Sequence, residues 1–194
     1  MSNCWLRYGM VVLLLGIPVA AHSQNVVAPL MGVSSWNEDT FDINGVTIVL
    51  DTDNAVARGV EFAHIFATGL RLGGQAQYQQ VDVLSSTATS RPGYADIFHV
   101  NLLVSYYIPV HEVVKPYFGV GMGSTQISFH GGPMDTLDGD SYFGKAGLEL
   151  KIADRVAWTL GAKARYFKVR DDNATMKTNT VDYFMGLNFY TRGI

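Results

Sequence analysis

The sequence predicts an all-β protein: a closed antiparallel up-and-down transmembrane β-barrel of about eight strands, preceded by an N-terminal signal peptide. Two observations lead to this prediction. Segments of about ten residues alternate apolar with polar or small side chains and are separated by turn residues, a pattern typical of membrane barrels. The composition agrees, because only 16% of the 194 residues are charged, whereas the chain contains 20 Gly, 10 Tyr and 10 Phe. One barrel domain accounts for this length.

Residues 1–23 have the features of a secretory signal peptide. Arg7 precedes an apolar run, and small residues precede a cleavage point before Gln24, with Ala21 as an alternative end. The apolar run is shorter than the roughly 20 residues that a membrane-spanning helix needs, which favours a cleaved signal over an uncleaved anchor. The barrel domain is therefore expected to occupy residues 24–194.

Three segments show the alternation most clearly, namely 98–106, 158–166 and 183–189. In each of them an aromatic residue stands at both ends of the apolar stripe, and segment 70–78 has one at a single end. Aromatic residues in such positions are typical of the two membrane–water interfaces. The predicted interfacial aromatics are Tyr78, Phe98, Tyr106, Trp158, Tyr166, Tyr183 and Phe189.

Alternation alone does not decide which face is outside, because a soluble lipocalin-like barrel would turn its apolar stripe inward. The polar stripe here contains Gly, Gln and single charges rather than dense Lys and Glu, and such a stripe favours a membrane barrel with a polar interior. The interior charges are nearly balanced, which predicts a paired, sealed and non-conducting network. The predicted interior network is Glu61, Arg71, Lys145, Glu149, Lys163, Arg165 and Asp182.

The strands and connections follow from the same pattern. Pro29 lacks an N–H and is expected at the start of the first strand. Asn44-Gly45 is a hairpin signal that predicts an outer hairpin in the first loop, with a ten-stranded barrel as the alternative. The expected strands lie near 30–37, 57–66, 69–83, 97–108, 115–129, 140–151, 155–169 and 180–191. Long polar connections are expected at 38–56, 84–96, 130–139 and 170–179, with short turns at the other, periplasmic end.

Two segments resemble a known family. Residues 116–123 (PYFGVGMG) resemble the strand that recurs in the small OmpX, OmpA-barrel and opacity-type outer-membrane family, and residues 59–78 resemble its second hairpin. The resemblance covers residues 28–192. It implies a bacterial outer-membrane location after export across the inner membrane, with outer-membrane lipid, lipopolysaccharide and the barrel assembly machinery as partners. The chain differs from the family in continuing past Phe189 and Tyr190, whereas such barrels usually end on an aromatic residue.

No catalytic, cofactor or metal motif is found. Cys4, the only cysteine, lies in the signal segment, so the mature chain is expected to have neither a disulfide nor a Cys-ligated metal. His99 and Ser105 share a face but stand about 20 Å apart along a strand, too far to form a hydrolytic pair. Gly119, Gly121 and Gly123 alternate within a strand with no helix after them, so they are expected to make room for inward aromatics rather than to bind a nucleotide.

The net charge and the acidic clusters of the chain bear on two further kinds of partner, nucleic acids and divalent cations. Nucleic acid is not expected, because the chain carries a net charge of −3 and no basic patch is clustered in the sequence. Residues 51–62 fail the EF-hand pattern. The cluster of Asp135, Asp138 and Asp140 is compatible with loose divalent-ion bridging to lipopolysaccharide. We expect a monomer.

The predicted function is that of a non-enzymatic barrel whose surface loops contact ligands, lipopolysaccharide or host surfaces. One alternative is a transporter of small hydrophobic molecules, as a resemblance to OmpW-type barrels would allow. The other is a lipid A-modifying barrel enzyme. A run of apolar inward residues would favour the transporter. Apolar residues are expected on the inward face only as isolated cases, namely Leu103, Phe143, Phe167 and Phe184.

Overall fold

The computed structural model describes residues 24–36, 40–43, 46–51, 55–86, 93–108, 110–131, 136–171 and 174–191. The predicted signal segment, residues 1–23, lies outside the described residues. No helix in the described part of the chain is long and apolar enough to cross a membrane. The strands are β1 (Gln24–Trp36), β2 (Thr40–Ile43), β3 (Val46–Asp51), β4 (Ala55–Ile65), β5 (Leu70–Ser86), β6 (Tyr94–Tyr107), β7 (Val114–His130), β8 (Thr136–Ala153), β9 (Val156–Asp171) and β10 (Ala174–Tyr190).

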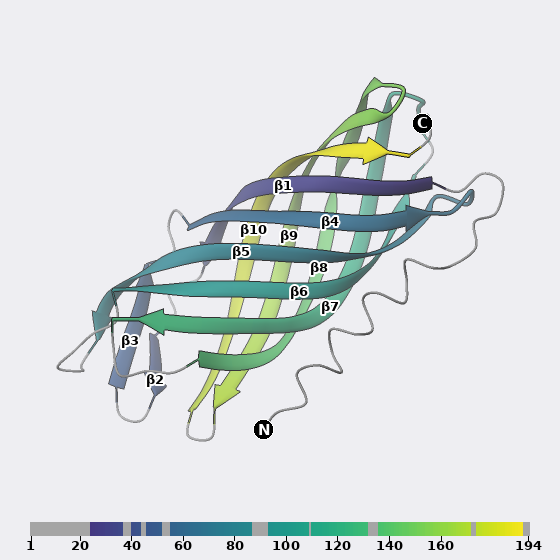
Figure 1. Ribbon diagram of the computed structural model, residues 1–194. Helices are drawn as coiled ribbons and strands as arrows, with labels where there is room; N and C mark the ends of the chain where they lie inside the picture. The colour runs from purple at the N-terminus through teal and green to yellow at the C-terminus, as the bar shows by residue number, and fades with distance from the viewer. Residues whose placement is uncertain are drawn as a thin grey trace.

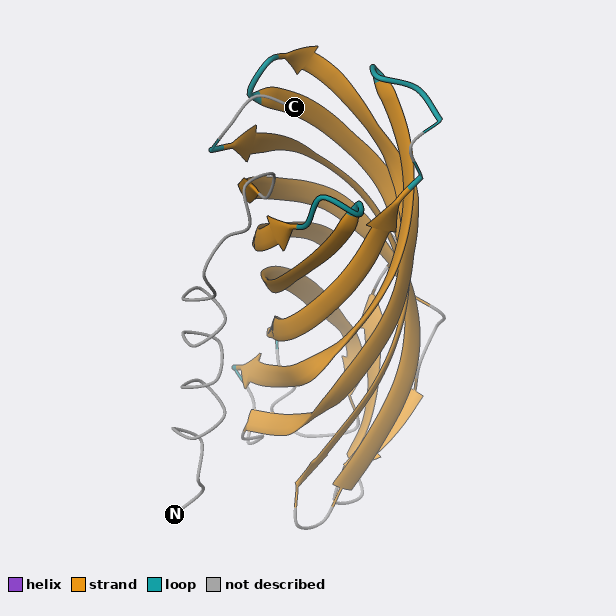
Figure 2. Ribbon diagram, turned by 90° about the vertical axis from the view of Figure 1, so that its right-hand side faces the viewer, coloured by secondary structure: helices purple, strands orange, loops and turns teal. Residues whose placement is uncertain are grey.

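Eight of the ten strands form a closed antiparallel barrel. The ring runs β1-β4-β5-β6-β7-β8-β9-β10, and β10 pairs with β1 to complete it. In Figure 1 β1 and β4–β7 cross the front of the barrel and β8–β10 pass behind them. Figure 2 shows the strands curving around a common axis, with strands as the only regular elements in the described part. The predicted eight-stranded closed barrel is confirmed.

The first connection contains the predicted outer hairpin. Strand β3 pairs with β2 and with the far end of β5, in the register Ile48↔Ser86 and Asp51↔Asp82. Because β4 pairs only with the earlier part of β5, β3 continues the barrel wall beyond the start of β4. The hairpin lies at one end of the barrel, at the lower left of Figure 1. We call this the loop end, and the opposite end, with its short turns, the turn end. Residues 44–45 lie outside the described residues.

Strand β1 begins earlier than the sequence analysis predicted. Pro29 lies in the middle of β1 rather than at its start, which corrects the expected strand of 30–37. On the β10 side Val27 pairs with Phe189 and the next pair is Leu30 with Gly186, so the ladder skips the proline. This interruption accommodates the missing N–H, and the register on the two sides of the gap is the same.

Two predicted long connections are shorter than expected. Residues 170–179 are mostly strand, because β9 continues to Asp171 and β10 begins at Ala174. Residues 136–139, placed in a loop from the sequence, are the first residues of β8. In both places small and polar residues suggested a loop, yet the inward positions Met176 and Leu137 are buried and keep the alternation of a strand.

At the turn end the connections are short. The turn between β4 and β5 closes through a hydrogen bond from the Gly69 N–H to the Phe66 carbonyl, at 3.0 Å. Gly69 has a φ of 84°, a conformation that only glycine adopts readily. The β8–β9 turn occupies residues 154–155. Short turns at one end and longer connections at the other agree with the predicted up-and-down topology.

Candidate functional site

The seven charged residues predicted for the interior all point into the barrel and are buried. They come from five strands, β4, β5, β8, β9 and β10, and each occupies an inward position of its strand because successive side chains alternate between the faces of a sheet. The structure divides them into two ion-pair clusters and one isolated carboxylate.

The Glu61 cluster contains Glu61, Arg71 and Lys145. The Glu61 carboxylate lies 2.6 Å from the Arg71 guanidinium and 3.0 Å from the Lys145 ammonium group. Glu61 and Arg71 stand on neighbouring strands, whereas Lys145 reaches them from β8 on another part of the wall. Two cations thus share one buried carboxylate, and Lys145 also lies over the ring of Tyr117, 5.6 Å from its centroid.

The Asp182 cluster contains Asp182, Lys163 and Arg165. The carboxylate accepts from the Lys163 ammonium group at 3.2 Å and lies 3.5 Å from the Arg165 guanidinium. The Ser34 hydroxyl donates to the same carboxylate at 2.7 Å. The Gln77 side-chain oxygen accepts from both Lys163 and Arg165. This cluster therefore links β1, β5, β9 and β10 through hydrogen bonds across the interior.

Glu149 has a different environment from the other two carboxylates. It accepts hydrogen bonds from the Asn188 amide and the Tyr190 hydroxyl near the turn end, and no ion pair joins it to another described residue. The Arg71 guanidinium donates to the Tyr107 hydroxyl nearby. The buried rings of Tyr107 and Tyr117 lie in the same layer, with their centroids 5.4 Å apart.

The loop end of the interior is filled by apolar side chains, a feature that the sequence analysis missed. We call this group the apolar plug. Its members stand near the loop-end termini of seven strands, where the inward face changes from polar to apolar. This change from polar to apolar inward residues is the sequence feature that could have predicted the plug. It is hard to recognise in any one strand, because each strand contributes only one or two such residues. The plug consists of Ala55, Val81, Val83, Ala95, Ile97, Ile127, Phe129, Leu137, Phe167, Val169 and Met176.

His99 and Ser105, the candidate hydrolytic pair, do not contact each other by a hydrogen bond in the described interior. His99 is fully buried, its ring nitrogen lies 2.7 Å from the Thr125 hydroxyl, and its ring packs edge-on against Phe167. Buried Ser105 makes no side-chain hydrogen bond there. No group of three potential metal ligands is found in the described ranges. Among the acidic residues named from the sequence, Asp138 and Asp140 point outward on β8, and Asp135 lies outside the described residues.

Glycines make room for several interior rings. A Cβ at Gly121 would overlap the Phe143 ring and would lie 2.7 Å from the Leu102 carbonyl oxygen. At Gly147 a Cβ would lie 2.6 Å from the Tyr117 hydroxyl. Inward glycines of neighbouring strands thus admit large side chains into a narrow barrel, as expected for Gly121. The same expectation is wrong for Gly119 and Gly123, where a Cβ would meet Ser105 and Asn101 rather than an aromatic ring.

The outward face carries two rings of aromatic side chains. All seven predicted interfacial aromatics point outward, with exposed fractions between 37% for Tyr106 and 63% for Tyr183. Tyr106, Trp158 and Phe189 stand towards the turn end, and the other four towards the loop end. Between the two rings the outward side chains are mostly apolar or small, as the wall of a membrane-inserted barrel requires.

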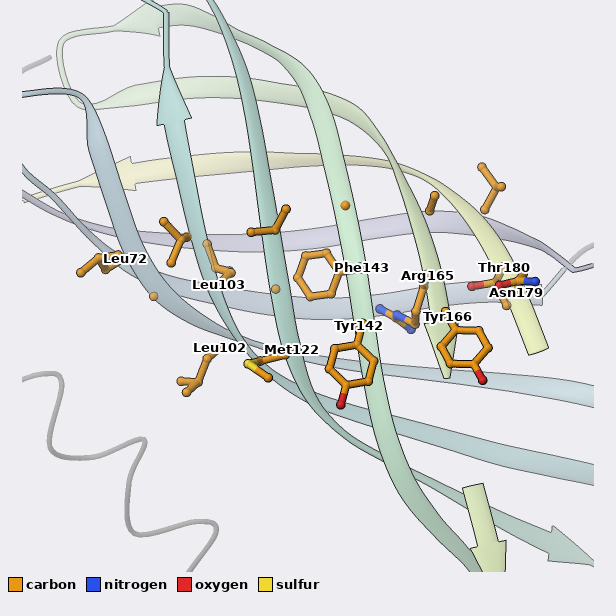
Figure 3. A pocket seen from close by; sticks show the side chains of 17 residues that line it. Leu72, Leu102, Leu103, Met122, Tyr142, Phe143, Arg165, Tyr166, Asn179 and Thr180 are labelled. Carbon is orange, nitrogen blue, oxygen red and sulfur yellow. The ribbon is translucent and has the colours of Figure 1, made fainter. Parts of the chain in front are cut away.

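A broad groove of about 980 Å³ follows one level of the barrel wall from β5 to β10. Most of its lining residues point outward, and the buried inward residues between them, among them Leu103, Phe143, Arg165 and Thr180, complete the lining. Tyr142 and Tyr166 border it on the same side as Leu102 and Met122 (Figure 3). Its depth comes from small outward residues, because a Cβ added at Gly144 would meet nothing within 4 Å. The outward side chains that border it on β7–β10 include Met122, Tyr142, Gly144, Ala164, Tyr166 and Val181.

Comparisons with known proteins agree with this geometry. A solved structure of Neisserial surface protein A (NspA) is 12% identical, with a TM-score of 0.58, and the alignment covers 86% of this chain and 96% of that one. OprG from Pseudomonas aeruginosa is 14% identical, with a TM-score of 0.54 and coverage of 88% and 96%. The N-terminal β-barrel domain of P. aeruginosa OprF is 9% identical, with a TM-score of 0.51 and coverage of 86% and 96%. At these identities the likeness is one of fold.

No curated protein sequence is matched. A family model described as "Outer membrane protein beta-barrel domain" matches residues 10–189. This match spans most of the chain and agrees with the closed eight-stranded barrel and its outer aromatic rings. The predicted location in the bacterial outer membrane is thereby confirmed, and the chain belongs to the outer membrane protein beta-barrel domain family.

Proposed function

We propose that this protein is a non-enzymatic outer-membrane barrel with a sealed interior, and that its loop end contacts ligands, lipopolysaccharide or host surfaces. The observation that supports the proposal best is the filled interior. Tyrosines and Glu149 occupy the turn end, the two ion-pair clusters occupy the middle, and the apolar plug occupies the loop end. An interior of this kind leaves the barrel as a rigid support for its external connections.

The size of the barrel and its electrostatics support a sealed interior. Eight strands enclose a space that side chains can fill, whereas water-filled porins need roughly twice as many strands. In the middle layer Glu61 and Asp182 each contact two cations, and their side chains are 3% and 2% exposed. Hydrated pore walls would leave such groups accessible to water.

Planar-bilayer recording tests the proposal. Purified full-length protein should give no steady conductance under conditions in which a trimeric porin, recorded as the positive control, conducts. Heat-modifiable migration on a gel confirms that the protein tested is folded. Reproducible single-channel steps of porin size would contradict the sealed interior.

The apolar plug favours a second candidate function, the transport of small hydrophobic molecules. A run of apolar inward residues is the feature that distinguishes this candidate, and the plug provides one at the loop end. Uptake of an apolar fluorescent probe into proteoliposomes tests it. A transporter should accelerate uptake over empty liposomes, and Ile127→Trp should abolish the acceleration by overfilling the plug. Val120→Trp, on the outward face of the same strand, is the matched control. Equal uptake with and without protein would exclude the transporter.

A further inference from the structure

Three basic residues gather on the outward face of β9 and β10 near the loop end. They are Lys168, Arg170 and Lys177, and register places Lys177 directly opposite Lys168. Like charges directly opposite each other destabilise an antiparallel strand pair unless a counter-charge lies between them. Asp140 and Asp138 oppose Lys168 and Arg170 on the β8 side, yet none of the three bases forms an ion pair with a residue whose side chain the structure describes.

These bases stand just beyond the aromatic ring of the loop end. Lys168 is the next outward residue after Tyr166 on β9, and Asp140 is the next after Tyr142 on β8. Aromatic rings mark the membrane interface, so the charges lie at the level of lipid headgroups. Phosphate groups attached to a lipid are the anions that occupy this level.

The basic residues are confined to one side of the barrel. Beyond Tyr78 on β5 the outward residues are Gln80 and Asp82, and beyond Phe98 on β6 the next is Asp96. Within the described residues, every outward Lys or Arg beyond the aromatic ring of the loop end therefore lies on β9 or β10. A general attraction to an anionic membrane surface would not require this asymmetry.

The apolar groove lies directly below the bases on the same strands. Ala164 and Gly144 line it, and Tyr166 stands between Ala164 and Lys168 on the outward face of β9. Its volume of about 980 Å³ falls at the upper end of the range for ligand sites, about 300–1,000 Å³. A groove this wide suits several acyl chains that descend from one phosphorylated headgroup.

We propose that the β8–β10 face is a binding site for one lipopolysaccharide molecule. Lys168 and Lys177 contact a phosphate of its lipid A portion, Arg170 contacts a neighbouring phosphate or sugar oxygen, and the acyl chains occupy the groove over Ala164. The site specifies the lipopolysaccharide contact of the proposed function and rests on it, but it is independent of whether the interior is sealed. Lipopolysaccharide fits better than a phospholipid, because it combines phosphates and several acyl chains in one molecule of the outer leaflet.

Native mass spectrometry of the full-length protein in detergent micelles measures the binding. The probes are rough-type lipopolysaccharide, the same lipopolysaccharide after phosphatase treatment, and phosphatidylglycerol, each measured without and with EDTA. The wild type should retain intact lipopolysaccharide and bind the other two more weakly. Loss of binding in EDTA would show that a divalent ion, rather than the lysines, holds the phosphate, and would overturn the proposal.

A double variant and a matched control test the role of the lysines. Lys168→Gln combined with Lys177→Gln should weaken lipopolysaccharide binding roughly tenfold, as expected for two exposed charge contacts. The control Arg58→Gln removes an exposed base of β4 that pairs with Tyr78 of β5, and it should leave lipopolysaccharide binding unchanged. Equal losses for the double variant and Arg58→Gln would overturn the assignment.

The groove has its own test. Ala164→Leu fills it and should also weaken binding. The matched control is Ala76→Leu. Ala76 is the outward residue next to Tyr78 on β5, just as Ala164 is the outward residue next to Tyr166 on β9, but Ala76 lies outside the groove. This control should leave lipopolysaccharide binding unchanged. Heat-modifiable migration shows whether each variant folds. If Ala164→Leu folds and binds lipopolysaccharide as well as Ala76→Leu does, the acyl chains do not occupy the groove.

Discussion

Replacing Glu61 by Gln should destabilise the folded barrel strongly. The Glu61 side chain is 3% exposed and lies 2.6 Å from Arg71 and 3.0 Å from Lys145. Gln retains the shape and one acceptor oxygen but leaves two buried cations without a counter-charge. Removing one partner of a buried ion pair costs about 3–5 kcal/mol, and we expect the loss in the free energy of unfolding to fall in this range.

Urea unfolding in lipid vesicles, followed by tryptophan fluorescence, measures this loss. The control is Glu112→Gln, the same change at an exposed position in the turn between β6 and β7. Adding Lys145→Met to Glu61→Gln removes one of the stranded cations and should recover part of the lost stability. Lys145→Met alone should be destabilising. A gain in stability when it is added to Glu61→Gln therefore indicates relief of the unpaired charge, whereas a packing defect would be made worse by the second substitution.

The reasoning would be refuted if Glu61→Gln and Glu112→Gln unfolded at the same urea concentration. That result would mean that water reaches Glu61 and screens its cations, as in a porin. It would count against the sealed interior even if bilayer recordings showed no conductance.

Further predictions concern the outward face and the glycines. Leu160→Arg places a charge among outward apolar residues and should make the free energy of insertion into vesicles less favourable by about 2–4 kcal/mol. Its control is Gln80→Arg, which lies beyond the aromatic ring of the loop end and should insert like the wild type. Comparable folding yields would place Leu160 outside the lipid. Gly121→Ala forces a Cβ into the Phe143 ring and should lower the free energy of unfolding by about 1–3 kcal/mol. Gly144→Ala meets open space and should be neutral or stabilising by up to about 1 kcal/mol in the same urea titration, and a loss there would contradict the outward assignment.

Much of the outward face could be predicted from the sequence, because alternation assigns every second residue of a strand to one side. Alternation predicts Tyr78, Trp158 and Tyr183 on the outward face, and the structure exposes all three. Polar composition, by contrast, predicts a loop at residues 170–179, which are mostly strand. The expectation for Pro29 came from its missing N–H and is wrong, since the skipped ladder pairs depend on the neighbouring strand β10.

The sequence by itself determined which residues face inward, which face outward, and that about eight strands are available to close a barrel, because all three follow from the two-residue period of an extended chain. Only the tertiary structure decided which interior groups meet. Lys145 contacts Glu61 although 84 positions separate them in the chain, since closure of a tilted, staggered sheet brings β8 and β4 to the same level. The apolar plug and the lipid-facing groove arise in the same way: each strand contributes only a few residues, and the stagger between strands gathers them into one layer.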